Sequence, residues 1–350
     1  MTMPAPNKGR TPLFTLKNVF SRIGRRPSAA HPGALWHLPA FLLACSPQSA
    51  QEAQLTLPAR KVQIYVSQPG KTTHEGLDLL FFQGKPLEKL DAYQHFDALP
   101  PNPVPGISST AARKMVAFSG CPGDIYDWSD IRTYPSLENR RFRLEDENPE
   151  SPMMVGTCEL PEGTSRSVRI SLQPMLSRIT LRSIACDFTG RGYAGEPLRN
   201  VRAYLTWASR ECQPTAENDH PVSWLNAGRL DETETASLPH PEMVCSAVSP
   251  ALSHRIYPSL SFFCYPNPSE GASFGQPVTR LVIEGQLQGT TCYYPIDLPG
   301  LKANTQYRMD VTLTRAGTSD PDTPAVAGTV LLESRIMDWD ERDWNDIHYQ

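Results

Sequence analysis

The segment GASFG at residues 271–275 matches the nucleophile motif G-x-S-x-G. In that motif the serine lies on a sharp turn between a strand and a helix, where its hydroxyl can attack an acyl group. Here Pro266 and Pro268 precede the segment, and Pro277 and the apolar run 281–283 follow it. This context is that of a loop, so a glycine-serine turn is the favoured interpretation and serine catalysis is the alternative.

Metal chemistry has one weak candidate, the segment DWDERD at residues 338–343. It begins like a calcium-binding loop, but Arg342 stands at a ligand position and Asp343 replaces the glycine that the loop requires. The histidines after residue 45 are scattered, at His74, His95, His220, His240, His254 and His348. We therefore expect no metal, no cofactor and no enzymatic activity.

Several aromatic residues alternate with polar ones and could stack against sugar rings, as Trp and Tyr do in binding sites. They are Trp128, Trp207, Trp224, Tyr293 and Tyr294. Packing in a hydrophobic core is the favoured interpretation, and sugar binding is the alternative.

Cys45 carries the clearest candidate chemistry, which is acylation. Residues 1–44 contain six basic residues and no acidic residue, and they end in a short apolar stretch before Cys45, as in a secretory signal. The segment LLAC at residues 42–45 resembles the bacterial lipobox, which implies cleavage before Cys45 and lipid attachment to it. An ordinary cysteine in an exported or buried segment is the alternative.

The seven other cysteines show no CxxC pair and no zinc-ligand spacing; they are Cys121, Cys158, Cys186, Cys212, Cys245, Cys264 and Cys292. Some could pair in an exported protein. Cys186, Cys264 and Cys292 lie in apolar runs, so we expect them to act as small buried hydrophobic residues.

Composition limits the class of protein. The 350 residues include 34 prolines, which interrupt helices and favour a loop-rich β protein. The formal net charge is −4, and all 37 acidic residues follow residue 44, so nucleic-acid binding is not expected.

Period-two alternation is the dominant local pattern and predicts strands with one buried face. It is clearest at residues 307–313, where Tyr307, Met309, Val311 and Leu313 alternate with polar residues. Other predicted strands are residues 62–66, 77–83, 114–118, 166–172, 179–184, 201–207, 260–265, 280–285, 291–296 and 330–336. Residues 86–96 are a candidate short helix.

Several short motifs together resemble the fimbrillin-like subunits of Bacteroidales type V pili, over most of residues 55–345. They are LDAYQ at 90–94, LSRITL at 176–181, DFTGRGYAGEPL at 187–198, NVRAYL at 200–205, SWLNAG at 223–228 and YRMDVTLTR at 307–315. The resemblance implies an all-β fold of two transthyretin-like antiparallel β-sandwich domains with Greek-key connections, in tandem. With Pro174 as the boundary, we expect a signal peptide at residues 1–44, a tether at 45–54 and sandwiches at 55–174 and 175–350.

The resemblance also implies a structural role at the cell outer membrane, as a lipid-anchored anchoring or accessory subunit of a surface fimbria. Family subunits join their neighbours by β-strand addition, in which a strand pairs with an open sheet edge. Stalk subunits of the family are processed at an arginine, for which Arg60-Lys61 is the candidate here. The motifs favour the anchoring subunit, and a tip subunit is left open. Residues 330–336 are either a strand for exchange or an ordinary intradomain strand.

The expected partners are other fimbrial subunits. A glycan-binding surface lipoprotein or tip adhesin, with a glycan or host ligand, is the alternative function. A hydrolase whose nucleophile and base come together only on folding is the third.

Overall fold

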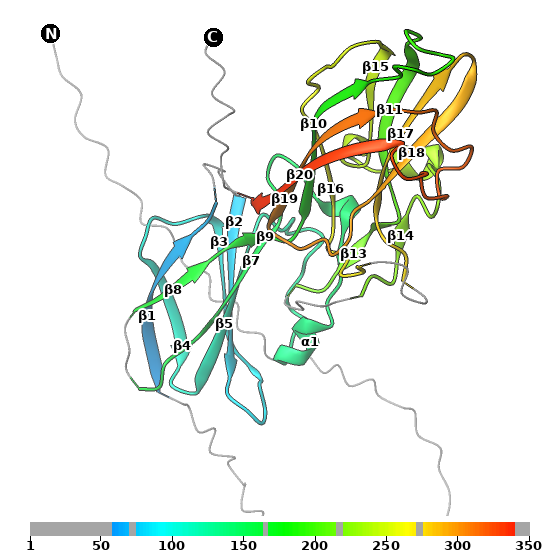
Figure 1. Cartoon of the computed structure of the whole chain (residues 1–350). Coiled ribbons are helices and arrows are strands. Elements are labelled where there is room, and N and C mark those ends of the chain that lie inside the picture. Colours follow the sequence, from blue (N-terminus) through cyan, green and yellow to red (C-terminus); the bar gives the residue numbers. More distant parts are fainter. Residues whose placement is uncertain (1–57, 70–74, 164–166, 215–219, 271–275, 340–350) are drawn as a thin grey trace, which may run out of the picture. The chain divides into compact units, whose positions relative to one another are not determined.

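The computed structural model describes residues 58–339 except 70–74, 164–166, 215–219 and 271–275. Nearly all regular structure in these residues is β, which confirms the predicted all-β class (Figure 1). The described residues from Ala59 onward belong to one compact unit. Cys45, the proposed signal and tether, His74, the GASFG segment and most of the acidic C-terminal segment lie outside the described residues.

The first pair of sheets contains a three-stranded sheet of order β4-β1-β8 and a five-stranded sheet of order β3-β2-β5-β7-β9. Their strands are β1 (Ala59–Ser67), β2 (Glu75–Gln83), β3 (Leu90–Ala98), β4 (Val104–Ser109), β5 (Ala112–Ser119), β7 (Met154–Glu159), β8 (Ser167–Ser171) and β9 (Gln173–Pro174). Strand β1 alternates strictly between exposed and buried residues, so Val62, Ile64 and Val66 enter the core between the sheets.

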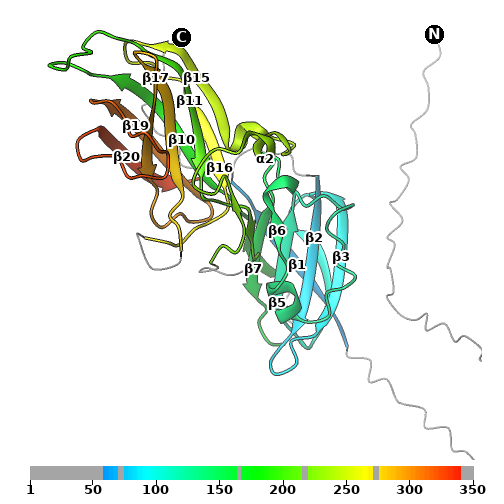
Figure 2. The same ribbon diagram turned by 90° about the vertical axis from the view of Figure 1, so that its right-hand side faces the viewer.

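The second pair of sheets has four strands in each, of orders β16-β10-β19-β20 and β15-β11-β17-β18. Their strands are β10 (Ser177–Cys186), β11 (Leu198–Thr206), β15 (Cys245–Leu252), β16 (Leu260–Cys264), β17 (Arg280–Leu287), β18 (Thr290–Asp297), β19 (Thr305–Leu313) and β20 (Val330–Asp338). Figure 2 shows the strands of this pair in a second orientation. Tyr307, Met309, Val311 and Leu313 are buried as the alternation predicted.

Short elements complete the chain. They are α1 (Tyr134–Glu138), β6 (Phe142–Arg143), the 3-10 turn η1 (Leu144–Asp146), β12 (Ala208–Ser209), β13 (Glu211–Cys212), β14 (Trp224–Leu225), α2 (Glu232–Ala236) and the 3-10 turn η2 (Pro241–Met243). Strand β6 lies in the segment between β5 and β7 of the first pair of sheets, and it pairs with β13, which lies between β11 and β15 of the second pair. Next to it, the Tyr265 hydroxyl donates to Oε1 of the buried Glu147 carboxyl group at 2.9 Å.

The pairing departs from a purely antiparallel sandwich in two places. Strand β1 pairs in parallel with β8, and β10 pairs in parallel with β19. Both pairs join strands distant in sequence, as crossover connections do. Antiparallel pairs make up the rest, so the sandwich prediction is confirmed with these two additions.

The candidate helix at residues 86–96 is wrong, because Leu90–Ala98 form strand β3. Strand β3 pairs along most of β2, and this tertiary pairing overrides a weak local helix preference. All seven described cysteines carry free thiols. Cys264 and Cys292 are buried as predicted, and Cys186 is half-buried against the core.

Candidate interaction interface

Strand β20 forms the margin of its sheet. It pairs with β19 in continuous antiparallel register, from Thr305 opposite Asp338 to Leu313 opposite Val330. Among the described residues no strand pairs with its other edge, and Figure 1 shows β20 beside β19. An unpaired edge of nine residues presents a row of backbone N–H and C=O groups that another strand can bind.

The apolar residues of β20 are unusually exposed. Ile336 stands opposite Tyr307 and Leu332 opposite Val311, so these side chains point to the core side of the sheet. Tyr307 and Val311 are 7% and 0% exposed, whereas Ile336 and Leu332 are 66% and 41% exposed. Packing against this face of the sheet therefore ends before β20. Leu332 and Ile336 form an exposed apolar strip, which we call the apolar ledge of β20.

The C-terminal end of β20 is firmly attached. Met337 is 4% exposed, and the Trp339 N–H donates to the Asn304 carbonyl at 3.1 Å. The Trp339 ring lies 5.7 Å from the Phe263 ring, measured between centroids. Strand β20 is thus fixed in place while its outer edge and its ledge stay accessible.

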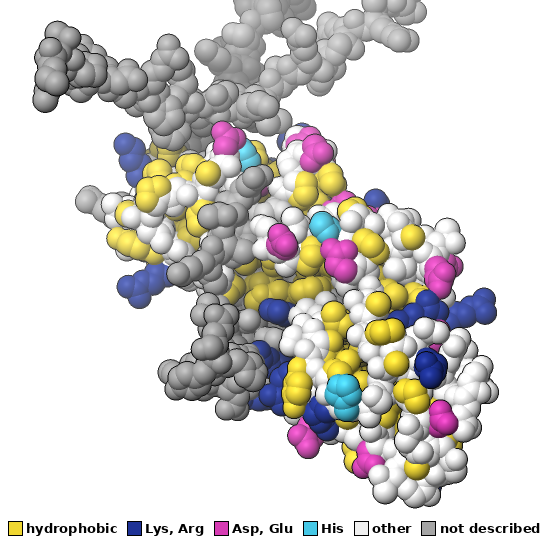
Figure 3. All heavy atoms as spheres, turned by 90° about the horizontal axis from the view of Figure 1, so that it is seen from above, with side chains coloured by type: hydrophobic (Ala, Val, Ile, Leu, Met, Phe, Trp, Pro, Cys, Tyr) yellow, Lys and Arg dark blue, Asp and Glu magenta, His cyan; other side chains and the backbone are white. Residues whose placement is uncertain are grey.

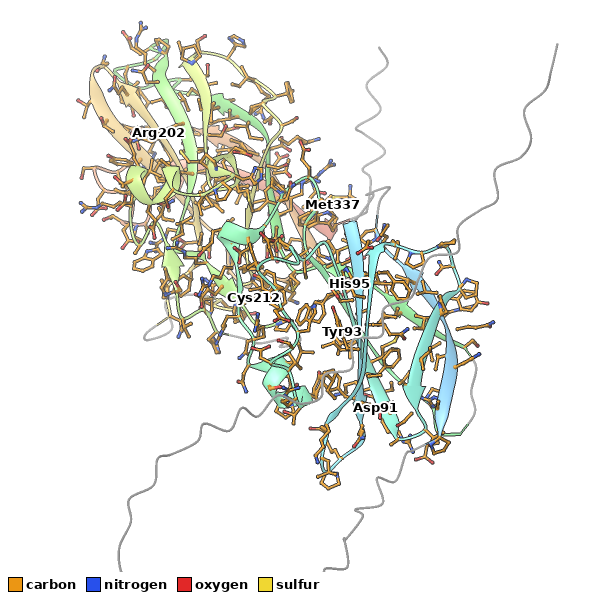
Figure 4. All side chains as sticks on the ribbon, turned by 180° about the vertical axis from the view of Figure 1, so that it is seen from behind. Asp91, Tyr93, His95, Arg202, Cys212 and Met337 are labelled. Atoms are coloured by element: carbon orange, nitrogen blue, oxygen red, sulfur yellow. The ribbon has the colours of Figure 1, made fainter. Side chains whose placement is uncertain are left out.

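The edge of β4 is closed, in contrast. The Ile107 N–H donates to Gln94 Oε1 and the Ser109 N–H donates to Asp91 Oδ2, both at 2.6 Å. Asp91 and Gln94 belong to β3, in the opposite sheet, and Figure 4 shows Asp91 on that strand. Side chains therefore occupy the backbone donors that an added strand would need.

Arg60, the candidate processing residue, lies in β1 and is 5% exposed. Its guanidinium donates to the carbonyls of Pro161 at 2.9 Å and Ala112 at 3.3 Å. Burial and the nearby Arg113 lower the pKa of Arg60. A protease that must enclose the arginine side chain cannot reach Arg60 while β1 is paired.

Polar side chains of β2 and β3 form a network that the sequence did not predict. Asp78 Oδ1 accepts from the Tyr93 hydroxyl at 2.7 Å and lies 2.8 Å from His95 Nδ1. His95 Nε2 lies 3.3 Å from the exposed Asp97. Burial and the hydrogen bond to Asp78 raise the pKa of Tyr93. Both imidazole nitrogens of His95 therefore lie near carboxylates, and Tyr93 and His95 link β3 to Asp78 on β2 (Figure 4).

The other predicted side chains do not converge. Trp128 and Tyr294 are buried, which confirms core packing for these two. Trp207 packs edge-to-face on Trp224 and donates to Asp322 at 2.8 Å. The described residues contain no group of His, Cys, Asp or Glu that could hold a metal, and no helix among them is long and apolar enough to cross a membrane.

Comparison with solved structures relates this fold to cell adhesion and fimbrial proteins of Bacteroidales. No protein-family model and no curated protein matches the chain in sequence. A solved structure of a proposed cell adhesion protein from Bacteroides eggerthii DSM 20697 is similar, with TM-score 0.58, 17% identity, and 81% of this chain and 96% of that chain covered.

Two fimbrial structures from Porphyromonas gingivalis are also similar. A fimbrilin from strain W83 has TM-score 0.56 and 13% identity, covering 80% of this chain and 97% of that chain. The tip fimbrial protein Mfa3 has TM-score 0.50 and 10% identity, covering 80% of this chain and 100% of that chain. The resemblance drawn from the short motifs is thus confirmed at the level of the fold: this chain has the fold of the fimbrillin-like proteins.

Proposed function

We propose that the chain is a structural, non-enzymatic subunit of a fimbria that joins a neighbouring subunit by β-strand addition along β20. The observation that carries this proposal is the open edge of β20 together with its exposed apolar ledge. A strand that pairs with this edge would satisfy backbone groups, and its alternate apolar side chains would cover Leu332 and Ile336. The shared fold with a fimbrilin supports the same role.

We also propose the position of the subunit, as an anchoring or accessory subunit held at the cell outer membrane by lipid on Cys45. In this proposal residues 1–44 are removed, 45–54 form the tether, and 55–174 and 175–350 form the two sandwiches. The pairing of strands supports this division, because β9 ends the first pair of sheets and β10 begins the second. The burial of Arg60 supports a subunit that keeps its first strand.

Strand addition is tested with a matched pair of variants. Ile336 and Val326 are both 66% exposed, but only Ile336 lies on the ledge of β20. We expect Ile336→Lys to lower the amount of neighbouring subunit recovered by crosslinking at least about tenfold, because a buried lysine is costly in an interface. Val326→Lys should leave recovery unchanged. Equal recovery with both variants would refute addition at β20.

The anchor is tested separately by mass spectrometry of the protein from the membrane fraction, comparing the parent with Cys45→Ala. An N-terminal acylated Cys45 in the parent, with release of the variant from the membrane, is the expected result. An unmodified Cys45 in a membrane-bound parent would refute lipid anchoring and would leave the β20 proposal intact.

A further inference from the structure

The outer face of the sheet β16-β10-β19-β20, which points away from the core, is rich in arginine. Arg178 and Arg182 come from β10, Arg308 from β19 and Arg335 from β20, and Arg255 reaches the face from the segment between β15 and β16. The described acidic residues that point to this face from β10, β19 and β20 are Asp310 and Glu333. We call this surface the arginine face. Its positive charge is opposite in sign to the formal net charge of the whole chain, which is −4.

Strand register places these side chains together. Arg308 stands directly opposite Arg335 on β20, and Thr180 of β10 is its neighbour on the other side. Directly opposed like charges disfavour pairing unless negative groups lie near them. The same strands bury Tyr307 and Met309 on the other face, so the arginine face is fixed by the hydrophobic alternation.

A β-bulge adds a further arginine. The register shifts between Leu181 and Ser183, so Arg182 is an extra residue and both Arg182 and Ser183 reach Asp310. Arg255 Nη1 donates to Ser183 Oγ at 2.8 Å and Arg255 Nη2 donates to Thr312 Oγ1 at 2.9 Å. Burial alone would raise the pKa of Asp310, but the bonds from Arg182 and Ser183 lower it. Asp310 thus accepts directly from the Arg182 guanidinium and is linked to Arg255 through the Ser183 hydroxyl.

Aromatic rings border the arginine face at its other end. The Arg178 guanidinium lies 5.9 Å from the ring centroids of Phe263 and of Trp339. Arg178 Nε and Nη2 also donate to Ser261 Oγ, at 3.2 and 3.1 Å. Burial and the neighbouring Arg308 lower the pKa of Arg178. Figure 3 shows one face of the molecule, on which Lys and Arg side chains and Asp and Glu side chains both lie at the surface.

We propose that the arginine face binds an acidic polysaccharide through its sulfate or carboxylate groups. Planar guanidinium groups bind both kinds of group with two parallel hydrogen bonds. A tryptophan beside them offers a surface for the apolar face of a sugar ring. The site goes beyond strand addition and does not depend on it, because it lies on the face of the sheet and not on its edge.

The test uses the full chain and three immobilised probes: heparin, polygalacturonate and neutral dextran. We expect binding to at least one of the two acidic polymers, weakening as salt rises, and none to dextran. Heparin alone would identify sulfate as the recognised group, and polygalacturonate alone would identify carboxylate. Both results support the proposal.

Charge-reversal variants locate the site. Arg255→Glu and Arg335→Glu should each weaken binding about fivefold or more, since a surface ion pair is replaced by repulsion. Arg229→Glu is the matched control, because Arg229 is exposed in the segment between β14 and α2, and it should change affinity less than about twofold. Circular dichroism confirms that each variant is folded, and Arg255, outside the strands, keeps the test valid if Arg335→Glu unfolds.

Two results would overturn the proposal. The first is that neither acidic polymer binds; binding to vesicles of phosphatidylglycerol in that case would assign the face to a membrane surface. The second is that Arg229→Glu weakens binding as much as Arg255→Glu, which would mean that only overall charge matters.

Discussion

Strands β4 and β20 are both edge strands, but the molecule treats their free backbone groups in opposite ways. Two side chains from β3 occupy the N–H groups of Ile107 and Ser109 on β4. Strand β20 has no such cover among the described residues, and it exposes Leu332 and Ile336. Unprotected apolar edges promote unwanted pairing, so proteins usually block them. The difference supports the proposal that a partner strand binds β20.

One β-bulge contributes to the closed edge of β4, and another contributes to the arginine face. In β3, Asp91 is the extra residue where the register with β2 shifts, and it turns toward β4. In β10, Arg182 is the extra residue and turns toward Asp310 on the arginine face. Bulges redirect single side chains without ending a strand. The same backbone device therefore closes one edge and builds a charged surface elsewhere.

The largest expected effect on the free energy of unfolding is at Glu147. This prediction also tests whether the two pairs of sheets unfold independently. Burial raises the pKa of Glu147 from its ordinary value of 4.5 to about 8. The folded state therefore keeps a proton that the unfolded state loses, and this stability is complete below pH 4.5 and is lost as the pH rises toward 8. Glu147→Gln should gain on the order of 4 kcal/mol relative to the parent between pH 5 and pH 8.

Urea unfolding at both pH values measures this gain. Parallel pH profiles for parent and variant would contradict the buried, protonated carboxyl. A single transition that shifts as a whole would show that the link between Glu147 and Tyr265 couples the two pairs of sheets. Two transitions would show that they unfold separately.

Adjacent residues of β20 give the next largest effect. Met337 is 4% exposed and Ile336 is 66% exposed (Figure 4 labels Met337). Met337→Ala should lower the free energy of unfolding by about 2–4 kcal/mol, because it leaves a cavity. Ile336→Ala should cost less than about 1 kcal/mol, since little apolar area is lost from the core. Equal costs would mean that the ledge is part of the core.

The strands were largely predictable from the sequence, but their edges were not. Alternation identified β1 and β19, because one buried face requires a period of two. It did not identify β3, whose side chains alternate weakly and bind across to β4. The sequence also predicted a strand at residues 330–336. It could not show that Ile336 points to the core side of the sheet and is nevertheless exposed, because that depends on where the opposite sheet ends.

The candidate interface was therefore only partly accessible from sequence. The motifs indicated the fold, and the structure added which edge is open. The arginine face was invisible for the same reason: Arg182 and Arg308 are far apart in the chain, and only the parallel pairing of β10 with β19 brings their strands together. Acylation of Cys45 rests on a local motif and stays a prediction.

Removal of Asp91 is expected to have the third largest effect. The carboxylate accepts from the Ser109 N–H at 2.6 Å and also from the Ser109 hydroxyl and Gln83. Asp91→Ala should lower the free energy of unfolding by about 2 kcal/mol, because hydrogen bonds to a charged group are lost. Asp97→Ala, on the exposed side chain of the same strand, should stay within about 0.5 kcal/mol. Similar losses for both would show that Asp91 does not close the edge.

The smallest effect concerns Gln94, and it separates stability from edge protection. Gln94→Ala removes one neutral acceptor, that of the Ile107 N–H, and should cost about 1 kcal/mol in urea unfolding. Alone it should not raise self-association, because Asp91 still occupies the Ser109 N–H. The double variant with Asp91→Ala frees both donors, so sedimentation should show self-association well above the sum of the single variants. An additive result would mean that something other than these two side chains protects the edge of β4. Side chains from β3 would then not explain why the edge of β4 is closed while that of β20 is open.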